Sequence, residues 1–362
     1  MRRLSMTILH VVGARPNFMK AAPVVQALAR AGMAQVLVHT GQHYDEAMSG
    51  RLFTQLGLPV PDVNLNVGSG THAQQTAAIM LGMEAHLLDR RPSLVVVYGD
   101  VNSTVAAALV AAKMHIPIAH VEAGLRSFDR TMPEEINRMV TDRLATLLFT
   151  PSADGDENLL REGTPPDAIH RVGNVMIDSL VRCLPLADAG GVLAGVGLKP
   201  GDPYVLVTLH RPSSVDDPVM LEALLDTLSR LAKRLPIVFP VHPRTKVRIG
   251  ARALPGIHLI NPAGYFEFLA LERDARLVIT DSGGVQEETT FLGVPCLTVR
   301  ENTERPVTVT HGSNTLIGRD PKKLLDTAVA RLEAPKSDAS IPELWDGHTA
   351  ERIAAVLKTY LH

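Results

Sequence analysis

Short runs of apolar and β-branched residues alternate along the whole chain with stretches of helical periodicity. This alternation is typical of βαβ units, whose parallel strands are buried on both faces of the sheet. In the first half it predicts strands at 8–12, 35–39, 94–98, 118–121, 147–149 and 169–172, with helices at 21–31, 73–89, 104–115 and 133–144 between them. These elements make one doubly wound α/β domain.

The second half of the chain repeats this rhythm. It predicts strands at 204–208, 237–240, 257–260, 277–279, 295–298 and 315–317, and helices at 218–235, 266–273, 284–292 and 321–332. A connection at 184–203 is rich in Ala, Gly and Pro and follows a linking helix from about Asn174. We therefore predict two Rossmann-like, doubly wound parallel-sheet domains, residues 1–175 and 176–344, facing each other across a cleft. The last helix, at about 345–362, either packs back on the first domain or extends the second.

Composition narrows the class of protein. Of the 362 residues, 46% are hydrophobic and 20% are charged, which excludes a disordered chain. A chain of this length is longer than one hydrophobic core usually supports, which favours two domains. Lys and Arg number 36 against 38 for Asp and Glu, so the net charge of -2 gives no general attraction to nucleic acid or anionic lipid. The two cysteines, Cys183 and Cys296, lack metal-type spacing, and no apolar run approaches the ~20 residues that span a bilayer. We therefore expect a cytoplasmic protein without metal, export signal, nucleic-acid partner or membrane partner.

Ligands of open parallel sheets bind beyond the carboxyl ends of the strands, so the loops there are the informative ones. The loop at 13–20 matches neither of the two standard glycine-rich nucleotide fingerprints. Instead, Arg15 and Lys20 bracket a predicted helix start, where cationic side chains and exposed N–H groups favour an anion. The alternative is an ordinary surface turn with two solvated cations.

The segment 281–288 follows an apolar strand and opens a helix, and its glycines let backbone N–H groups approach a phosphate. Ser282 is an N-cap type of residue, although Ser-Gly-Gly also caps helices for purely structural reasons. Glu287 and Glu288 lie one turn further on, where a carboxylate suits the ribose hydroxyls of a nucleotide. Arg305 is another candidate partner for phosphate. This loop therefore favours a nucleotide over inorganic phosphate.

Acidic residues mark the ends of strands in the first half. Asp100 and Glu122 each end an apolar strand, where a charge is costly to bury unless it faces a cleft. Glu134 and Glu135 follow a proline at a helix start, where acids are also common for structural reasons. We interpret Asp100 and Glu122 as functional and leave both readings open for Glu134.

Two histidines end strands of the second half. His210 and His242 are expected at the same sheet edge as the glycine loop, where an imidazole can act as acid, base or hydrogen-bond donor to a leaving phosphate. Metal binding is the other use of histidine, but neither His210 nor His242 lies in an H-x-x-x-H or H-E-x-x-H motif, and no cysteine cluster is present. We therefore expect no metal site.

The loops are recognisable in combination. They are the segments 13–20, 40–43, 99–100, 120–126, 133–138, 281–288 and 303–306. The chain resembles the bacterial non-hydrolysing UDP-N-acetylglucosamine 2-epimerases over nearly its whole length, and these segments occur in the same order as the motifs of that family. The resemblance implies a GT-B-like fold, a homodimer and the reversible conversion of UDP-GlcNAc to UDP-ManNAc for envelope polysaccharides, with no cofactor. It also implies elimination of UDP to a bound 2-acetamidoglucal, followed by re-addition.

The resemblance assigns roles by motif. The catalytic positions that it implies are Asp100, Glu122, Glu134 and His210. The nucleotide contacts that it implies are Arg15, Lys20, Phe268, Ser282, Gly283, Gly284, Glu288 and Arg305. A second UDP-GlcNAc acts as an allosteric activator in bacterial members, and the matching positions are Gln42, His43, Arg211 and His242.

The histidine motif departs from the family pattern. Many members read His-Arg-Arg-Glu-Asn, whereas here His210 and Arg211 are followed by Pro-Ser-Ser. The allosteric activation and the preferred N-acyl sugar, such as a UDP-diacetamido sugar, therefore stay open. Three other functions also stay open: a hydrolysing epimerase, a GT-B glycosyltransferase and a non-catalytic UDP-sugar sensor.

Overall fold

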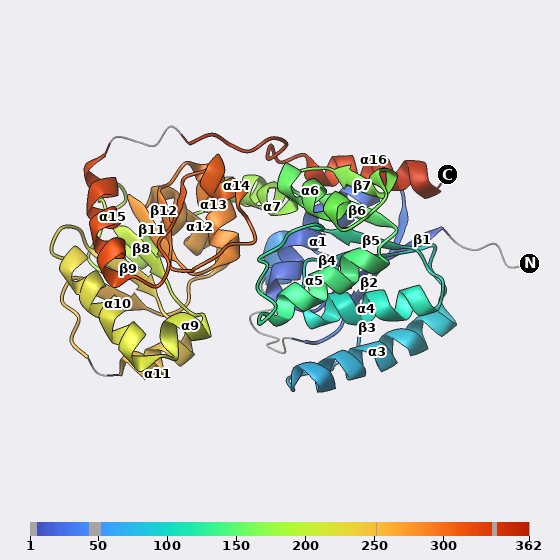
Figure 1. Cartoon of the computed structure of the whole chain (residues 1–362), viewed down its shortest axis with the longest axis horizontal. Helices are drawn as coiled ribbons and strands as arrows, with labels where there is room; N and C mark the ends of the chain where they lie inside the picture. Colours follow the sequence, from blue (N-terminus) through green and yellow to red (C-terminus); the bar gives the residue numbers. More distant parts are fainter. Residues whose placement is uncertain (1–5, 43–51, 251, 335–338, 362) are drawn as a thin grey trace, which may run out of the picture. The chain divides into compact units, whose positions relative to one another are not determined.

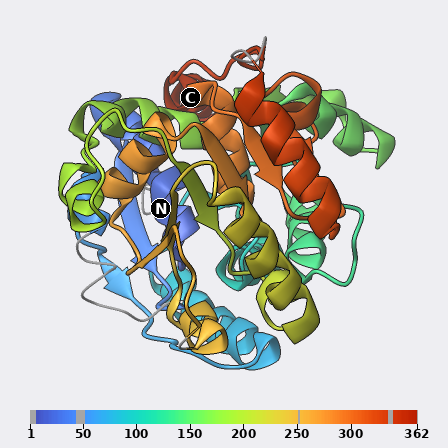
Figure 2. The ribbon, with the colours of Figure 1, turned by 90° about the vertical axis from the view of Figure 1, so that its left-hand side faces the viewer.

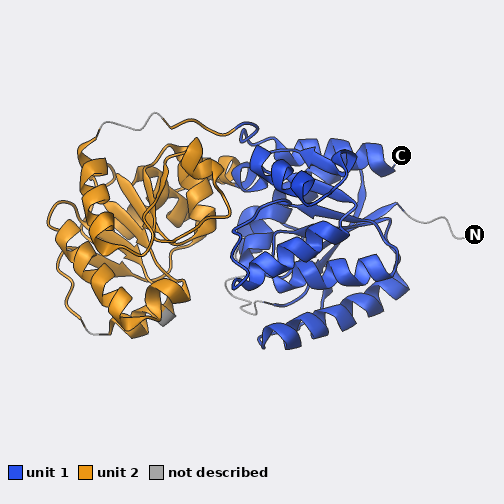
Figure 3. Ribbon diagram, viewed as in Figure 1, with its two compact units in different colours: residues 1–179, 343–362 blue, residues 180–342 orange. Residues whose placement is uncertain are grey.

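The computed structural model describes residues 6–42, 52–250, 252–334 and 339–361 (Figure 1). The chain forms two compact units (Figure 3). Unit 1 comprises residues 1–179 and 343–362, and unit 2 comprises residues 180–342. Each unit has its own parallel sheet with helices on both faces.

The sheet of unit 1 has seven parallel strands in the order β3-β2-β1-β4-β5-β6-β7. The strands are β1 Thr7–Val12, β2 Ala34–His39, β3 Val63–Asn64, β4 Leu94–Tyr98, β5 Ile118–Val121, β6 Leu147–Thr150 and β7 Ile169–Arg171. The chain winds outward from β1 in both directions, which is the topology of a doubly wound sheet. The strand-order reversal between β1 and β4 brings the loops after these two strands to one point of the sheet edge.

Helices cover both faces of this sheet (Figure 1). They are α1 Arg15–Arg30, α3 His72–Asp89, α4 Asn102–Lys113, α5 Pro133–Leu144, α6 Ala153–Arg161, the 3-10 turn η1 Pro166–Ala168, α7 Val175–Cys183 and α16 Thr349–Leu361. α3, α4 and α5 pack in series, and α1 packs against α16. Ile79 and Met83 of α3 are fully buried together with Val95 and Val97 of β4. The core of unit 1 therefore lies between the sheet and these helices.

The C-terminal helix α16 belongs to unit 1. The carboxylate of Asp178 in α7 accepts hydrogen bonds from the backbone N–H groups of Thr349 at 3.1 Å and Ala350 at 2.7 Å. Arg30 of α1 and Glu351 of α16 form an ion pair at 2.7 Å. An acid at the N-terminus of a helix satisfies donors that have no partner inside the helix. These contacts fix the start of α16 on the first unit.

The sheet of unit 2 has six parallel strands in the order β10-β9-β8-β11-β12-β13, with the same winding. The strands are β8 Val205–Thr208, β9 Ile237–Pro240, β10 Ile257–Ile260, β11 Leu277–Thr280, β12 Cys296–Thr298 and β13 Asn314–Leu316. The helices are η2 Leu184–Leu186, α8 Gly190–Gly195, α9 Pro212–Val215, α10 Pro218–Leu231, α11 Pro243–Ile249, α12 Tyr265–Asp274, α13 Gly283–Leu292, α14 Val307–Thr310 and α15 Pro321–Glu333. α10 and α15 lie side by side on one face of the sheet (Figure 2).

The fold class predicted from the sequence is confirmed, because both units are doubly wound parallel sheets. Two predicted helix boundaries are wrong by several residues, and the helix expected at 218–235 ends already at Leu231. The helix expected at 21–31 begins already at Arg15. Asn17 is the reason, since its side-chain oxygen accepts hydrogen bonds from the N–H groups of Gly13 and Ala14, each at 3.1 Å. The loop expected to bind an anion at this place is therefore largely the first turns of α1.

Several short elements were not predicted, among them α9, α11 and α14 of unit 2. The two-residue strand β3 at Val63–Asn64 and the helix α6 at Ala153–Arg161 are absent from the predicted elements. The connection expected at 184–203 contains the short helix α8. Each of these elements is too short to produce a sustained period of hydrophobic residues.

Candidate functional site

Glu122 follows β5 and pairs with Lys20 of α1. The Lys20 Nζ lies 2.6 Å from Glu122 Oε1, and both side chains are buried, with 6% and 3% of their surface exposed. Gly99 is part of this contact, because a Cβ there would lie 2.7 Å from Lys20 Nζ. The backbone of Glu122 has a φ of 76°, a left-handed conformation that is costly for a residue other than glycine. Glu122 is therefore held in a strained but fixed position.

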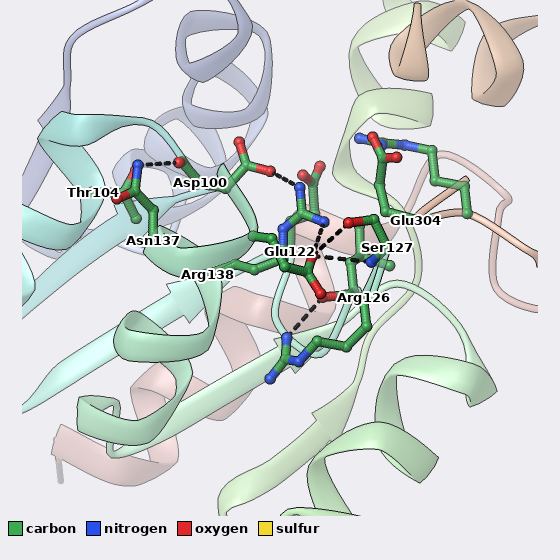
Figure 4. Close-up of polar contacts among 12 residues, drawn as sticks. Asp100, Thr104, Glu122, Arg126, Ser127, Asn137, Arg138 and Glu304 are labelled. Atoms are coloured by element: carbon green, nitrogen blue, oxygen red, sulfur yellow. Dashed lines mark hydrogen bonds and ion pairs between the residues drawn. The ribbon is translucent and has the colours of Figure 1, made fainter. Parts of the chain in front are cut away.

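Asp100 follows β4 and pairs with Arg138 of α5 (Figure 4). The other side of the Arg138 guanidinium lies 2.9 Å from Glu135 Oε2. Glu135 in turn accepts hydrogen bonds from the N–H and hydroxyl of Ser127, at 3.0 and 2.9 Å, and from the N–H of Phe128 at 2.9 Å. The Asp100 side chain keeps 20% of its surface exposed, whereas Arg138 keeps 3%. Arg138 thus presents Asp100 at the edge of the sheet.

The other predicted groups of unit 1 differ in their surroundings. Glu134 is half-buried in the first turn of α5, beside the fully buried Glu135. Arg15 is exposed at the first residue of α1. Lys20, expected at the helix start with Arg15, lies in the second turn of α1 with its ammonium on Glu122. The two cations expected to form one anion site are therefore in different environments.

Gln42, a predicted allosteric position, caps the helix α4. Its side-chain oxygen accepts hydrogen bonds from the N–H of Ser103 at 3.0 Å and from the hydroxyl of Ser103 at 2.6 Å. The backbone carbonyl of Gln42 accepts a hydrogen bond from Gln75 at 3.3 Å. His43, the adjacent predicted position, lies outside the described residues.

A second charged network, which the sequence did not reveal, lies under the acids of unit 1. His120 of β5 is fully buried and lies 2.6 Å from Asp142 of α5. Asp142 also pairs with Arg126 at 2.7 Å, and Arg126 with Glu162 at 2.7 Å. Burial would raise the pKa of Asp142, but His120 and Arg126 more than offset it and hold that pKa below its usual range. His120 and Arg126 belong to the segment 120–126, whereas Asp142 gave no signal in the sequence.

In unit 2, His210 follows β8 and Asp281 follows the neighbouring strand β11. The His210 Nδ1 lies 3.0 Å from Asp281 Oδ1. The backbone N–H groups of His210 and Arg211 donate to Asp281 Oδ2 at 3.0 and 2.9 Å. Burial would raise the pKa of Asp281, but these donors outweigh it and lower that pKa. Because Asp281 is fully buried and His210 is half exposed, the carboxylate orients the ring and leaves Nε2 facing outward.

Arg211 and His242 complete the predicted positions at this edge. Arg211 is half-buried after β8, and His242 is exposed after the adjacent strand β9. Both lie at the carboxyl ends of their strands, as the sequence predicted.

The glycine turn of unit 2 lies against Arg305. Ser282 precedes α13, and Gly283 and Gly284 form its first turn. A Cβ on Gly283 would lie 2.6 Å from Arg305 Nη1, so only glycine allows the guanidinium this close. Arg305 Nε lies 2.9 Å from Glu287 Oε1, and Arg305 also pairs with Glu304. The turn and Arg305 therefore lie together at the N-terminus of a helix, where backbone N–H groups favour phosphate, and the charge of Arg305 is balanced by Glu287 and Glu304.

Glu287 and Glu288, expected beside a ribose, have different partners. Glu287 binds Arg305. Glu288 is 4% exposed and accepts a hydrogen bond from the Tyr265 hydroxyl at 2.9 Å. Burial raises the pKa of Glu288 to about 7, and burial together with Glu288 raises the pKa of the fully buried Glu272 well above its usual range. The two carboxyl groups therefore share protons at neutral pH. Phe268, another predicted contact, is half-buried on the same helix as Tyr265.

Within residues 6–42, 52–250, 252–334 and 339–361, no group of three or more His, Cys, Asp and Glu side chains is arranged to hold a metal ion. No helix in this part of the chain is both long and apolar enough to cross a membrane.

Comparisons with known proteins agree with one another. The family model described as UDP-N-acetylglucosamine 2-epimerase matches residues 26–358. The UDP-N-acetylglucosamine 2-epimerase of Methanocaldococcus jannaschii is 41% identical over 358 residues, covering 96% of this chain and 97% of that protein. The UDP-2,3-diacetamido-2,3-dideoxy-D-glucuronate 2-epimerase of Pseudomonas aeruginosa is 42% identical over 360 residues, covering 97% of this chain and 99% of that protein.

Solved structures show the same likeness. The M. jannaschii enzyme in complex with UDP-GlcNAc and UDP matches with a TM-score of 0.90 and 41% identity, over 98% of this chain and 100% of that one. The UDP-GlcNAc 2-epimerase of Neisseria meningitidis bound to UDP-GlcNAc matches with a TM-score of 0.89 and 28% identity, over 98% of this chain and 100% of that one. The relatives are archaeal as well as bacterial, so the resemblance is wider than the bacterial group expected from the sequence.

Proposed function

The chain belongs to the UDP-N-acetylglucosamine 2-epimerase family, and we propose that it interconverts UDP-GlcNAc and UDP-ManNAc by inverting C2 of the sugar without hydrolysis. In this reaction UDP leaves C1 while the C2 proton is removed, which gives a bound 2-acetamidoglucal. A proton then reaches the opposite face of C2, and UDP adds back to C1. The reaction consumes neither water nor a cofactor.

The observation that carries this proposal is the pair of acids at the ends of the adjacent strands β4 and β5. Inversion at C2 requires one group that takes a proton and another that gives one. Glu122 is fixed by Lys20 and Asp100 by Arg138, so both carboxylates have defined positions at one sheet edge. We assign the proton transfers to Glu122 together with Asp100 or Glu134.

Unit 2 supplies groups suited to the leaving UDP. C2 carries no carbonyl that would acidify its hydrogen, so the departure of UDP must first build positive charge on the sugar, and cationic donors on the diphosphate lower that barrier. We propose that Arg305 and the turn at Ser282–Gly284 bind the diphosphate, and that His210 assists its departure. Arg15 and Phe268 add nucleotide contacts in this proposal, and Glu288 binds the ribose hydroxyls.

A second substrate has specific support. The P. aeruginosa relative, 42% identical over 97% of this chain, acts on a UDP-diacetamido-dideoxy-glucuronate according to its name. The same C2 inversion applies to that sugar, because the 2-acetamido group and the diphosphate are unchanged. The two substrates differ at C3 and C6, whereas the reaction changes C2 and the bond from C1 to the diphosphate.

The test is an NMR time course of the purified protein with each UDP-sugar in D2O. With the preferred substrate we expect the C2 epimer to appear with deuterium at C2. Free ManNAc and UDP at turnover would indicate a hydrolysing epimerase instead. Binding without any product from either sugar would indicate a UDP-sugar sensor, and a product that requires an acceptor would indicate a glycosyltransferase.

We also propose that the chain is a cytoplasmic homodimer. The outer face of α3 supports a partner surface, because Leu81 and Leu88, two turns apart, are 70% and 72% exposed although the other face of this helix is buried. Leu81→Glu with Leu88→Glu should convert a dimer to a monomer in sedimentation velocity. Val219→Glu, at a residue 79% exposed in unit 2, is the control that should leave the dimer intact.

Allosteric activation by a second UDP-GlcNAc is part of the same proposal. It would involve Gln42, His43, Arg211 and His242, as the resemblance implies. The expected sign is activation of the ManNAc-to-GlcNAc direction by added UDP-GlcNAc. Hyperbolic kinetics without that activation would indicate that the altered sequence after Arg211 has removed the second site.

A further inference from the structure

The hydrogen bonds of His120 define its charge. The ring is fully buried on β5, with Nδ1 2.6 Å from Asp142 Oδ1 and Nε2 2.8 Å from the carbonyl oxygen of Gly99. A carboxylate and a carbonyl both only accept hydrogen bonds, so both ring nitrogens must donate. A ring that donates from both nitrogens is an imidazolium. His120 is therefore a buried cation between two loops.

The surrounding charges balance this cation. Asp142 Oδ2 accepts from Arg126 Nη1 at 2.7 Å, and Arg126 forms a two-pronged pair with Glu162 at 2.8 and 2.7 Å. Two cations and two carboxylates thus alternate along one chain of contacts. The buried pair of His120 and Asp142 depends on both members, because removing one leaves a charge without its partner in a low dielectric.

The network holds both loops that carry the proposed proton-transfer acids. Its His120 end binds the Gly99 carbonyl, which is joined directly to Asp100. Asp142 Oδ2 accepts the N–H of Gly124 at 3.1 Å, two residues after Glu122. Both loops leave their strands in left-handed backbone conformations, with φ of 59° at Gly99 and 76° at Glu122. Glycine adopts this conformation without strain, but Glu122 does not, and its strained backbone persists only where the surroundings fix it.

We propose that His120 and Asp142 are positioning residues for the C2 inversion: a buried imidazolium and its carboxylate that hold the loops of Asp100 and Glu122 at one spacing. This inference requires the proposed function. Neither residue contacts the reacting sugar in this assignment. Their effect passes through the Gly99 carbonyl and the Gly124 N–H. Small displacements of reacting groups are enough to lower turnover strongly.

The kinetic test is the variant Asp142→Asn, which keeps the size of the side chain and removes its charge. His120 then loses its anionic partner, becomes neutral and can no longer donate from both nitrogens. We expect kcat for C2 inversion to fall roughly 100-fold, with KM changed less than about threefold, because unit 2 supplies the UDP contacts. An unchanged kcat would overturn the proposal.

Glu162→Gln is the matched control. It breaks the far end of the same network at a side chain that is 39% exposed, but leaves His120 and Asp142 in contact. We expect kcat to stay within about threefold of the wild type. Equal losses of kcat in both variants would mean that the network acts on stability alone, and would also overturn the proposal.

A measurement on the unaltered protein tests the geometry even if Asp142→Asn fails to fold or the substrate is different. Nitrogen-15 NMR of the histidine rings distinguishes protonated from unprotonated nitrogens, and the signals of His120 are identified by their loss in His120→Gln. We expect both ring nitrogens of His120 to be protonated at neutral pH, because each faces an oxygen that can only accept a hydrogen bond. A single protonated nitrogen at neutral pH would overturn the proposal without touching the proposed function.

Discussion

Asp142 in unit 1 and Glu288 in unit 2 are equally buried, each 4% exposed, yet their pKa values move in opposite directions. Burial favours the neutral form of both. Asp142 has His120 and Arg126 against its two oxygens, and these cations lower its pKa below the usual range. For Glu288, burial outweighs the hydrogen bonds with Glu272 and Tyr265, which lower its pKa, and the pKa rises to about 7. The charge of a buried acid therefore depends on its partners more than on its depth.

The same difference separates the carboxyl edges of the two sheets. In unit 1 the acids that end the strands are each joined to a cation, as in Glu122 with Lys20 and Asp100 with Arg138. In unit 2 the edge carries a glycine turn, an arginine and a histidine. Both sheets wind in the same order, so the fold determines where the loops meet and the side chains determine what they do. This contrast predicts that unit 1 controls turnover and unit 2 controls binding.

The largest expected effect is that of Glu122→Gln. The amide keeps the shape of the side chain but cannot accept the C2 proton, so kcat should fall roughly 1,000-fold or more. Loss of deuterium incorporation at C2 in D2O is the direct measurement. UDP binding measured by calorimetry should change little, because the proposed diphosphate contacts lie in unit 2. Deuterium incorporation at the wild-type rate would remove Glu122 from the proton transfer.

The next largest effect is on stability, and the same chemical change, acid to amide, is compared in the two units. Asp142→Asn should lower the free energy of unfolding by about 3 kcal/mol, since it leaves His120 and Arg126 without their shared anion. Glu272→Gln should change it by less than about 1 kcal/mol at pH 7, because Glu272 already carries a proton there and the amide is also neutral and a donor. Urea unfolding measures both.

The single tryptophan allows the unfolding of unit 1 to be distinguished from that of the whole chain in this experiment. Trp345 is buried in unit 1, where its Nε1 donates to the Pro151 carbonyl at 2.9 Å, so its fluorescence follows the unfolding of unit 1. Circular dichroism follows both units. If Glu272→Gln is the more destabilising of the two changes, the proposed difference between the buried acids is wrong.

How much of the structure could be predicted from the sequence depends on how far apart along the chain the interacting residues are. Alternating apolar runs are local, and they predicted strands such as β4 at Leu94–Tyr98 and β9 at Ile237–Pro240 with their observed bounds. The start of α1 was missed although Pro16 at a helix start is a local signal. The loops that end the strands were found because the topology of parallel sheets places them together.

The partners of the site residues were not predictable in the same way. Glu122 was found from its strand, but its partner Lys20 is 102 residues away, and the contact depends on how α1 packs on the sheet. In the sequence His120 is one residue of an otherwise apolar strand, and only the structure shows its contact with Asp142, 22 residues later. The sequence analysis expected Glu288 beside a ribose, one turn into a helix, but the structure shows it buried and bonded to Tyr265 of α12.

Two glycine variants with smaller expected effects test whether the carboxyl edges of the two sheets act on different kinetic constants. In Gly99→Ala the new Cβ would lie 2.7 Å from Lys20 Nζ and should push it from Glu122, so kcat should fall about tenfold with KM little changed. In Gly283→Ala the new Cβ would lie 2.6 Å from Arg305 Nη1, so KM should rise about tenfold with kcat little changed. Steady-state kinetics of both variants measure this.

Each glycine variant has a matched control. Gly32→Ala carries a similar backbone strain, with φ of 72°, but its Cβ would meet nothing within 4 Å. Gly191→Ala, in α8 of unit 2, also meets nothing within 4 Å. Both controls should keep the wild-type kinetics. A rise in KM for Gly99→Ala and a fall in kcat for Gly283→Ala would reverse the assignment of the two edges.

The smallest effect concerns Asp178, a buried carboxylate whose partners are the Thr349 and Ala350 N–H groups. Burial raises its pKa to about 6 although these donors oppose the shift. A folded pKa above the unfolded value of about 3.9 means that its stabilising contribution is complete below pH ~4 and is lost as the pH rises through about 6. From pH 5 to 7 the free energy of unfolding should therefore fall by roughly 1 kcal/mol relative to Asp178→Asn, measured by Trp345 fluorescence in urea.

Asp346→Asn is the control, because Arg352 lowers the pKa of Asp346 and that group stays ionised over this range. Parallel pH curves for the wild type and Asp178→Asn would show that two N–H donors balance burial as well as the cations around Asp142 do.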